Sequence, residues 1–185
     1  MTDTTAAADT HFDRKAFLQK YWDVTTAGDI DAMMDLLGDD CVYHYPGQHF
    51  LSGNYHGKKE VHQLYTTLAS MAVKAGMFQG VVHEIVLGDE FSLIVLSYRL
   101  NVLKGRSIPG RACGMMRIID GKVREYWLFE WDQRMINDVV WASAPQVFLK
   151  RKEYVRLAAS LPRSALGAVR TMGRLFGDYR APTPI

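Results

Sequence analysis

Residues 17–61 read FLQKYWDVTTAGDIDAMMDLLGDDCVYHYPGQHFLSGNYHGKKEV, and this stretch decides the fold. Phe17, Tyr21 and Val24 recur at the spacing of one helical face and predict a first helix. Ala27-Gly28-Asp29 would end it, because glycine favours the left-handed conformation in which helices commonly stop. The next helical pattern begins directly afterwards.

A second helix and a strand follow. Asp29 can cap this helix, since its side chain can accept a hydrogen bond from a free N–H of the first turn. The apolar face of the helix comprises Ile30, Met33, Met34 and Leu37. Gly38 is expected to stop it. Cys41–Tyr45 is β-prone and is followed by Pro46-Gly47, which predicts a strand that ends in a turn.

A third helix is predicted from Gly57 to Gly76. Its apolar positions share one face: Val61, Leu64, Tyr65, Leu68, Met71 and Ala72. Four β-rich runs come next: Val81–Leu87, Phe91–Leu103, Arg111–Ile119 and Val123–Trp131. Turn residues separate them, among them Pro109-Gly110 and Asp120-Gly121. This order predicts an α+β fold in which a strongly curved antiparallel sheet wraps round three N-terminal helices and leaves a cavity.

The composition is that of one globular domain. With 185 residues and 48% hydrophobic content, the chain can bury a sizeable core. No run approaches the ~20 apolar residues of a membrane span, and the first residues are too polar for a signal peptide. We therefore expect a soluble, cytoplasmic protein with a flexible N-terminus over residues 1–11.

Neither a metal nor a cofactor is expected. Cys41 and Cys113 lie in predicted strands and favour buried free thiols, with a disulfide or a nucleophile as the alternatives. Four histidines between residues 44 and 62 lack the spacing of a metal-ligand set. The chain has no glycine-rich phosphate motif and no nucleophile elbow. We also expect no nucleic-acid partner.

Residues 12–142 resemble the nuclear transport factor 2-like superfamily, the cone-shaped fold of ketosteroid isomerase, scytalone dehydratase and SnoaL-like polyketide cyclases. Short motifs carry the resemblance: Ala27-Gly28-Asp29-Ile30-Asp31, Asp39-Asp40, Tyr43-His44-Tyr45-Pro46-Gly47, the turn from Ser52-Gly53 to Gly57, and Asp120-Gly121-Lys122-Val123. Trp131-Asp132-Gln133 and the His-x-Pro-Gly run resemble SnoaL-like members in particular. The fold hosts enzymes and binding modules alike, so it does not fix the function.

The resemblance to ketosteroid isomerase places Tyr21 on the oxyanion-binding tyrosine of the first helix. Tyr45 takes the place of that enzyme's base, and Gly114 that of its protonated aspartate, so steroid isomerisation is not expected. The resemblance to scytalone dehydratase instead implies an acid–base pair of Tyr45 and His83. Histidine titrates near neutral pH and suits proton transfer, but a core histidine held by a hydrogen bond is the alternative.

Strand alternation, with Tyr45 placed in the cavity, adds further site residues. The residues predicted to face inward are Cys41, Tyr43, Ser97, Arg99, Asn101, Tyr126, Leu128, Glu130 and Asp132. Those predicted to face outward are His44, Ile94, Leu96, Tyr98, Leu100, Trp127, Phe129 and Trp131. A slip of one residue would reverse this assignment. Outward aromatic side chains favour a homodimer that pairs sheet against sheet.

Two roles remain open for the carboxylates late in the sheet. Arg99 can form an ion pair with Glu130 or Asp132, because a charge inside a cavity is costly unless it is paired. Alternatively, Asp132 or Glu130 is the general base, with a pKa raised by desolvation. The resemblance to SnoaL-like cyclases favours Asp132.

The C-terminal segment is basic. From Lys150 onward, eight Lys and Arg residues face two acidic ones, a balance of +6. Residues 146–161 and 163–177 are predicted as two helices divided by Pro162. The second carries an apolar stripe of Leu166, Val169, Met172 and Phe176. Docking on the same domain or a dimer mate is favoured, and a membrane surface or an acidic partner is the alternative.

Together these features predict a SnoaL-like domain over residues 12–145 and a basic helical extension over residues 146–185. The function expected from the resemblance is cofactor-independent acid/base catalysis on a small, largely apolar carbonyl or polyketide-type compound, as in a cyclase, isomerase or dehydratase. The proton-transfer pair would be His83 and Asp132, and Tyr21 and Tyr45 would donate hydrogen bonds. Six residues would bind substrate: Tyr43, Arg99, Ser97, Asn101, Glu130 and Tyr126. The rival is a ligand-binding or assembly module without catalysis.

Overall fold

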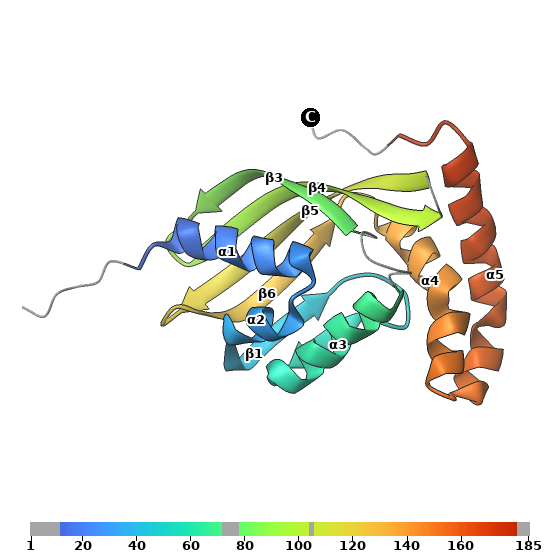
Figure 1. Cartoon of the computed structure of the whole chain (residues 1–185), viewed down its shortest axis with the longest axis horizontal. Coiled ribbons are helices and arrows are strands. Elements are labelled where there is room, and N and C mark those ends of the chain that lie inside the picture. Colours follow the sequence, from blue (N-terminus) through green and yellow to red (C-terminus); the bar gives the residue numbers. More distant parts are fainter. Residues whose placement is uncertain (1–11, 72–77, 104–105, 181–185) are drawn as a thin grey trace, which may run out of the picture.

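The computed structural model describes residues 12–71, 78–103 and 106–180 (Figure 1). Its elements are α1 (Arg14–Ala27), α2 (Ile30–Asp35), β1 (Leu37–Tyr45), β2 (Gly53–His56), α3 (Gly57–Met71), β3 (Phe78–Leu87), β4 (Phe91–Leu103), β5 (Arg106–Ile119), β6 (Lys122–Glu130), α4 (Gln133–Lys150) and α5 (Tyr154–Phe176). The segment 1–11 predicted to be flexible and the helix stop predicted at Gly76 lie outside the described residues.

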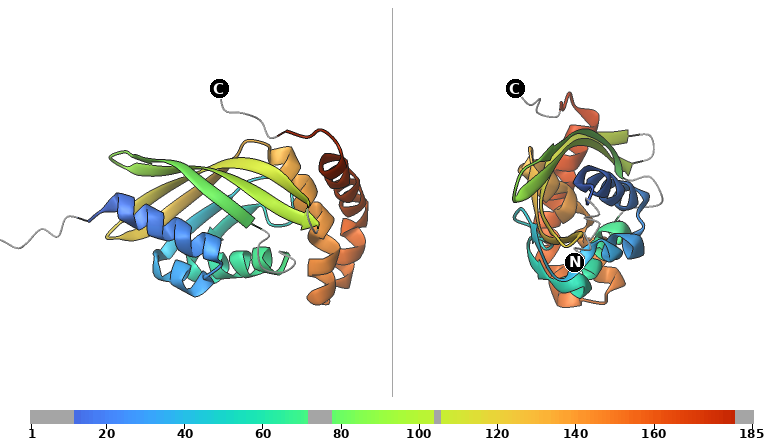
Figure 2. Two further views of the ribbon diagram at one scale, coloured as in Figure 1. Left: turned by 45° about the horizontal axis from the view of Figure 1, so that its top comes forward. Right: turned by 90° about the vertical axis from the view of Figure 1, so that its left-hand side faces the viewer.

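Six strands form one sheet in the order β2-β1-β6-β5-β4-β3. Neighbouring strands are antiparallel except β1 and β6, which are parallel. The α+β class is confirmed, but the sheet is mixed rather than antiparallel, because the last strand returns beside the first in the same direction. Helices α1, α2 and α3 lie on one face of the sheet, and α4 and α5 run side by side at one end of it (Figures 1 and 2).

The helix-to-helix junction at the N-terminus forms as predicted. Gly28 adopts a left-handed φ of 72°, and the Asp29 side chain accepts a hydrogen bond from the Ala32 N–H at 3.0 Å. The predicted stop at Gly38 is wrong, because α2 ends at Asp35 and Gly38 lies inside β1. A Cβ at Gly38 would lie 2.7 Å from the Arg124 side chain, so this glycine gives room to a cation that pairs with Asp40.

Strand β5 begins earlier than predicted. Pro109-Gly110 was expected to break the chain, but both residues pair with β4, where Gly110 lies opposite Tyr98. A Cβ at Gly110 would lie 2.2 Å from the Tyr98 ring, so the tyrosine lies directly against the bare backbone. The glycine therefore marks a close side-chain contact, not a turn.

The C-terminal helices also differ from the prediction. The chain reverses at residues 151–153, where Lys152 has a φ of 59°, and Pro145 and Pro162 both lie within helices. Pro162 and Ala158 are exposed, so water can satisfy the carbonyl that the proline leaves without an N–H donor. The predicted start of the extension at residue 146 falls inside α4. No helix among the described residues is long and apolar enough to cross a membrane.

Candidate functional site

Four tyrosines, three of them buried and Tyr65 partly buried, meet between the helices and the sheet. Tyr21 of α1 and Tyr43 of β1 share a hydrogen bond of 2.7 Å between their hydroxyls. The Tyr43 ring stacks on Tyr126 of β6 with centroids 4.7 Å apart, and its edge meets Tyr65 of α3 at 6.1 Å. Burial raises the pKa of all four, to about 12 for Tyr65, so their hydroxyls stay protonated and can donate hydrogen bonds.

This tyrosine cluster brings together three of the predicted site residues, namely Tyr43 and Tyr126 of the sheet and Tyr21 of the first helix. Tyr126 also explains the glycine at the position of the isomerase's aspartate. A Cβ at Gly114 would lie 3.0 Å from the Tyr126 hydroxyl oxygen. The tyrosine hydroxyl of the next strand therefore occupies the space beside Gly114.

Glu130 lies at the end of the same face of β6. It is half-buried, and its Oε2 accepts a hydrogen bond of 2.5 Å from the Tyr98 hydroxyl. Burial raises the pKa of Glu130 to about 7, the negative charge of Asp132 adds to the rise, and the Tyr98 hydrogen bond opposes it. Tyr45 is close enough that the Glu130 charge contributes, after burial, to raising the pKa of that tyrosine. The carboxyl group can therefore gain or lose a proton near neutral pH.

The predicted orientation of β4 is wrong by one residue. The side chains of β4 that turn into the core are Ser92, Ile94, Leu96, Tyr98 and Leu100. Ser97, Arg99 and Asn101 alternate with them on the opposite face, where Arg99 donates to the Ser107 hydroxyl at 3.3 Å. Hydrophobic burial decides the register here, since the apolar set gains more from the core than the polar set does.

His83 does not face the tyrosine cluster. It is exposed, and its Nε2 lies 2.7 Å from the Ser97 hydroxyl on the outer face of the sheet. A bulge between Val82 and Glu84 shifts the register of β3 at this residue. Val82 and Ile85 both pack on the core, which leaves His83 and Glu84 together on the outside. The predicted proximity of His83 to Tyr45 is therefore wrong.

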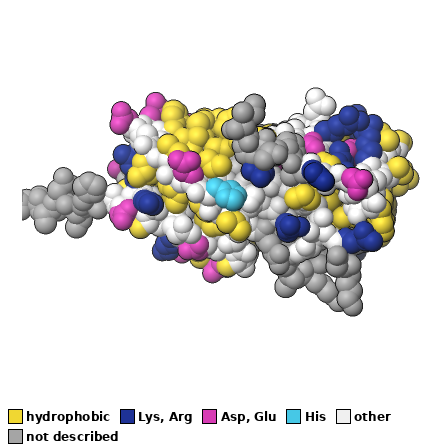
Figure 3. Space-filling model, turned by 90° about the horizontal axis from the view of Figure 1, so that it is seen from above, with side chains coloured by type: hydrophobic (Ala, Val, Ile, Leu, Met, Phe, Trp, Pro, Cys, Tyr) yellow, Lys and Arg dark blue, Asp and Glu magenta, His cyan; other side chains and the backbone are white. Residues whose placement is uncertain are grey.

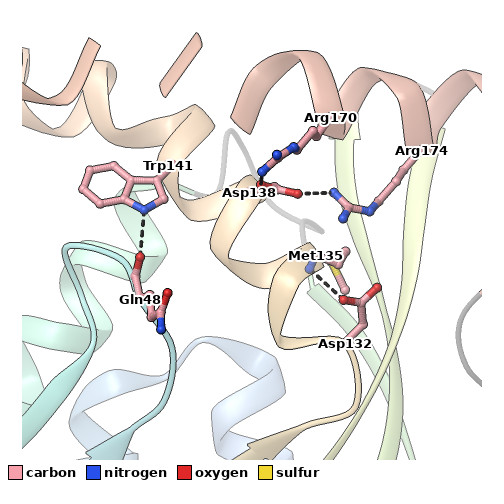
Figure 4. Close-up of polar contacts among 7 residues, drawn as sticks. All are labelled: Gln48, Asp132, Met135, Asp138, Trp141, Arg170 and Arg174. Carbon is pink, nitrogen blue, oxygen red and sulfur yellow. Dashed lines mark hydrogen bonds and ion pairs between the residues drawn. The ribbon is translucent and has the colours of Figure 1, made fainter. Parts of the chain in front are cut away.

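Asp132 holds the start of α4 (Figure 4). Its Oδ1 accepts the Met135 N–H at 2.8 Å, and its Oδ2 accepts the Tyr179 hydroxyl at 2.9 Å. Both carboxylate oxygens are thus engaged, one as a helix cap and one by the segment after α5. Arg99 lies on the other face of the sheet, so the ion pair predicted with Glu130 or Asp132 does not form.

The outward orientation predicted for the last strand is confirmed. Trp127 stacks on His44 with centroids 4.9 Å apart, and Phe129 and Trp131 are 49% and 44% exposed. Glu130 lies on the opposite, inward face. The aromatic side chains on the outer face are a surface on which another apolar surface could pack.

The loop after β1 is fastened to α4 and borders two hollows. The Trp141 indole N–H donates to the Gln48 carbonyl at 2.9 Å (Figure 4). A hollow of about 430 Å³ is lined by Gln48, His49, Phe50, Trp141 and Arg163. A second hollow of about 440 Å³ lies on the other side of Phe50, beside Tyr55, Phe148 and Arg151. Burial lowers the pKa of His49 to about 4, so this histidine is neutral at physiological pH.

The described part of the chain shows no group of three His, Cys, Asp or Glu side chains that could hold a metal ion. Cys41 and Cys113 are buried free thiols, as predicted, and burial raises the pKa of each. Among the described residues, the inward face presents a carboxyl with a raised pKa, Glu130, and a set of tyrosine hydroxyls.

Two of these groups were not selected from the sequence as inward donors. Tyr98 was placed outward, and Tyr65 was recognised only as an apolar position of the third helix. A signal for Tyr98 was present, because it alternates in phase with Ile94, Leu96 and Leu100. If Ile94, Leu96 and Leu100 face the core, strand alternation places Tyr98 on the same inward face as Glu130.

This fold, with its inward tyrosines and carboxyl, is that of a nuclear transport factor 2-like protein. Residues 18–126 match the SnoaL-like domain family, and the chain belongs to that family. No curated protein sequence matches it.

Several solved structures share the fold. A nuclear transport factor 2-like protein of unknown function from Burkholderia pseudomallei is 15% identical and superposes with a TM-score of 0.60, covering 68% of this chain and 95% of that one. A protein of unknown function with a cystatin-like fold from Xanthomonas campestris is 21% identical, with a TM-score of 0.59 and coverages of 66% and 94%. TerC, co-crystallised with polyporic acid, is 11% identical, with a TM-score of 0.59 and coverages of 68% and 96%.

Proposed function

We propose that this protein is a cofactor-independent acid/base enzyme that acts on a small, largely apolar carbonyl compound, in the manner of a cyclase, isomerase or dehydratase. The observation that carries the proposal is Glu130. This half-buried carboxyl has a pKa of about 7 and lies on the face of the sheet that presents the tyrosine hydroxyls. A general base is most effective when its pKa lies near the working pH.

The proposed chemistry needs two kinds of group. Ionised Glu130 removes a proton from the carbon next to the substrate carbonyl, and the electron pair of that C–H bond moves to form an enolate. A tyrosine hydroxyl donates a hydrogen bond to the enolate oxygen. Tyr45 is the proposed donor, because the Glu130 charge contributes to raising its pKa and its hydroxyl has no bond to the Glu130 carboxyl that would compete with the substrate. Glu130, now protonated, returns the proton to the same carbon or to another atom of the conjugated system.

Tyr98 has a positioning role in this scheme. Its hydroxyl holds Glu130 Oε2 at 2.5 Å, which leaves Oε1 available for the substrate proton. The same hydrogen bond opposes the rise in pKa caused by burial. It therefore keeps the pKa of the carboxyl near neutral pH, so that both the protonated and the ionised form are populated.

The route to this face is proposed to pass the hollow beside His49. The His49 and Tyr45 rings lie 5.8 Å apart, so this hollow borders the proposed donor. Curvature of the sheet round α1–α3, as in the cone-shaped fold, would enclose the substrate. TerC, which has the same fold, was crystallised with an organic acid, and this supports a small organic ligand here.

Deuterium exchange tests the proposal without knowledge of the natural substrate. The C–H groups next to the carbonyl of 2-tetralone, a small apolar ketone, are followed by NMR in D₂O with the wild-type protein. We expect exchange above the buffer rate, and a loss of about 10²–10⁴-fold of this enhancement in Glu130→Gln. Asp132→Asn is the matched control, because asparagine retains the helix cap and the exchange should stay within about threefold of wild type.

The alternative is a ligand-binding or assembly module in which the polar groups only satisfy one another. It predicts no exchange above buffer with 2-tetralone or with a panel of other enolisable ketones. It also predicts that Glu130→Gln and Asp132→Asn behave alike. Either result would overturn the proposal.

We propose in addition that two copies of the chain pair through the outer face of the sheet. The exposed Phe129 and Trp131 and the His44–Trp127 stack would form its centre. Phe129→Glu should shift a dimer to a monomer in analytical ultracentrifugation, and a wild-type monomer at micromolar concentration would contradict this assembly.

A further inference from the structure

Helix α5 packs on α4 through its small and polar residues. The buried positions of α5 are Ser160, Ser164, Gly167, Thr171 and Leu175. A Cβ at Gly167 would lie 2.5 Å from the Asp138 carbonyl oxygen, so the two helix backbones are in close contact at this point. The apolar stripe predicted from the sequence is not the face that docks.

Ion pairs with the buried carboxylate of Asp138 fix the rotation of α5 about its axis (Figure 4). Asp138 of α4, which is 5% exposed, contacts Arg174 at 2.8 Å and Arg170 at 3.4 Å. Breaking a buried pair by rotation would leave an uncompensated charge, which is strongly unfavourable. The opposite face of α5 is therefore held toward the outside.

That outer face is the apolar one. The exposed apolar side chains of α5 are Tyr154, Val155, Leu161, Leu166, Val169, Met172 and Phe176, here called the outer stripe. Val155 is 85% exposed and Val169 is 69% exposed. The stripe runs along a helix of 23 residues, about 34 Å long. Hydrophobic side chains line the right-hand end of the molecule in Figure 3, where Figure 1 places α5, with Lys and Arg next to them.

Cations border the outer stripe, and α5 contributes no carboxylate. Arg156, Arg163 and Arg170 recur every seven residues and so form one row along the helix. Lys150, Arg151 and Lys152 add three cations at the turn that precedes it. Glu153 pairs with Arg156 at 3.1 Å and Asp138 pairs with Arg170 and Arg174, but the cations on this side of the molecule outnumber these two carboxylates. A second copy of α5 packed on the stripe would bring the same excess of positive charge. A surface rich in negative charge complements this face better than a second α5 does.

We propose that α5 binds an anionic lipid surface, with the outer stripe inserted at the level of the headgroups and the bordering cations in contact with lipid phosphates. A helix with an apolar face, a row of arginines and aromatic residues near its ends has the composition of a helix that lies in the plane of a membrane interface. The ion pairs with Asp138 present the stripe as a rigid part of the folded domain. This surface is separate from the proposed catalytic face. The lipid-binding proposal is therefore independent of the proposed function.

Vesicle flotation of the whole protein tests the proposal. Vesicles of phosphatidylcholine alone are compared with vesicles that also contain phosphatidylserine. We expect binding to the mixed vesicles only, and weaker binding as salt is raised. Lys150→Gln with Lys152→Gln should weaken binding by about fivefold for each cation removed, since each contributes about one kcal/mol at such a surface.

The outer stripe is tested by Val169→Asp. This change should weaken vesicle binding at least about tenfold, because the valine that would be buried in the lipid is replaced by a charged side chain. The matched control is Gly173→Ala on the same side of α5, where an added Cβ meets nothing within 4 Å, and its binding should be unchanged. Circular dichroism of each variant verifies the fold, since Val169 contributes little to it.

Three results would overturn the proposal. One is a folded wild-type protein that does not float with phosphatidylserine vesicles. Another is equal binding of wild type and Val169→Asp. The third is a change of oligomeric state in Val169→Asp without vesicle binding by wild type, which would show that a second copy covers the outer stripe.

Discussion

Glu130 ends strand β6 and Asp132 follows two residues later at the start of α4, and the structure gives them opposite roles. Glu130 projects toward Tyr98 and Tyr45 and carries a pKa raised to about 7 by burial. Asp132 is the last residue before α4 and uses both oxygens, one on the Met135 N–H and one on Tyr179. The comparison shows that the surroundings of a carboxyl, and not its position in a sequence pattern, determine whether it can transfer a proton.

The largest expected contrast between the two carboxyls is in the pH dependence of stability. The pKa of Glu130 in the folded state, about 7, lies above its usual value of 4.5, so the fold binds this proton more tightly than the unfolded chain does. Its contribution is complete below about pH 4.5 and is lost as pH rises through about 7. At about 1.4 kcal/mol per pKa unit, the loss is roughly 3 kcal/mol.

Urea unfolding between pH 4 and pH 8 measures this effect as the difference between wild type and Glu130→Gln. The difference is needed because His49, whose pKa is lowered to about 4, acts with the opposite sign. The fold resists protonation of His49, so its contribution is lost as pH falls from about 6.5 toward 4. Asp132→Asn should keep the loss of stability with rising pH but shift it to slightly lower pH, because it removes the charge that adds to the rise in the Glu130 pKa. A Glu130→Gln profile parallel to wild type would refute the raised pKa.

The next effect concerns the hydrogen bond that distinguishes Glu130. Tyr98→Phe removes the donor at 2.5 Å and should raise the pKa of Glu130 further, by about one to two units, because a hydrogen bond to a charged group contributes about 1.5–3 kcal/mol. NMR titration of ¹³C-labelled glutamate carboxyls reports the change. Tyr65→Phe is the control, since that partly buried tyrosine belongs to the tyrosine cluster, and it should leave the pKa of Glu130 unchanged.

Loss of Asp132 should affect stability rather than chemistry. Asp132→Ala removes the cap of α4 and the acceptor of Tyr179, and it should lower the free energy of unfolding by about 1–2 kcal/mol. Asp29→Ala, which removes only the cap of α2, is the reference for a simple cap loss. Loss of ketone exchange in Asp132→Asn, which keeps the cap, would instead make Asp132 the base.

How much of this contrast the sequence could predict differs between the strands. The order of the three N-terminal helices, the first strand and the four long strands, the Gly28-Asp29 junction and the inward Tyr43 and Tyr126 follow from local patterns that the structure preserves. Strand β2, in place of the predicted turn at Ser52–Gly57, and the start of α4 at Gln133 do not. The alternation rule placed both carboxyls inward. It could not show that β6 ends at Glu130, which leaves Asp132 free to cap α4.

The remaining differences come from tertiary contacts. A bulge at His83 interrupts the alternation of β3, and no local residue pattern announces it. Gly38 and Gly110 were assigned to stops and turns, whereas they give room to Arg124 and Tyr98 from neighbouring strands. On α5 the sequence pattern predicts docking through the apolar stripe, but small residues allow the closer approach to α4.

The smallest effect is expected at His83, outside the proposed site. His83→Ala removes an exposed side chain whose hydrogen bond goes to Ser97, so stability should change by less than about 0.5 kcal/mol and ketone exchange should be unaffected. Ser97→Ala should behave in the same way. A large loss of exchange in His83→Ala with the fold intact would place the acid/base chemistry on the outer face of the sheet.

The pKa of Glu130 itself tests the central claim most directly, because it needs neither substrate nor partner. The chain is labelled with ¹³C at the glutamate carboxyls, Glu130 is assigned by comparison with Glu130→Gln, and the wild-type protein is titrated by NMR. We predict a midpoint near 7, well separated from the other glutamates. A midpoint at the ordinary value near 4.5 would show that Glu130 is a solvated carboxylate and would contradict the proposed acid/base role.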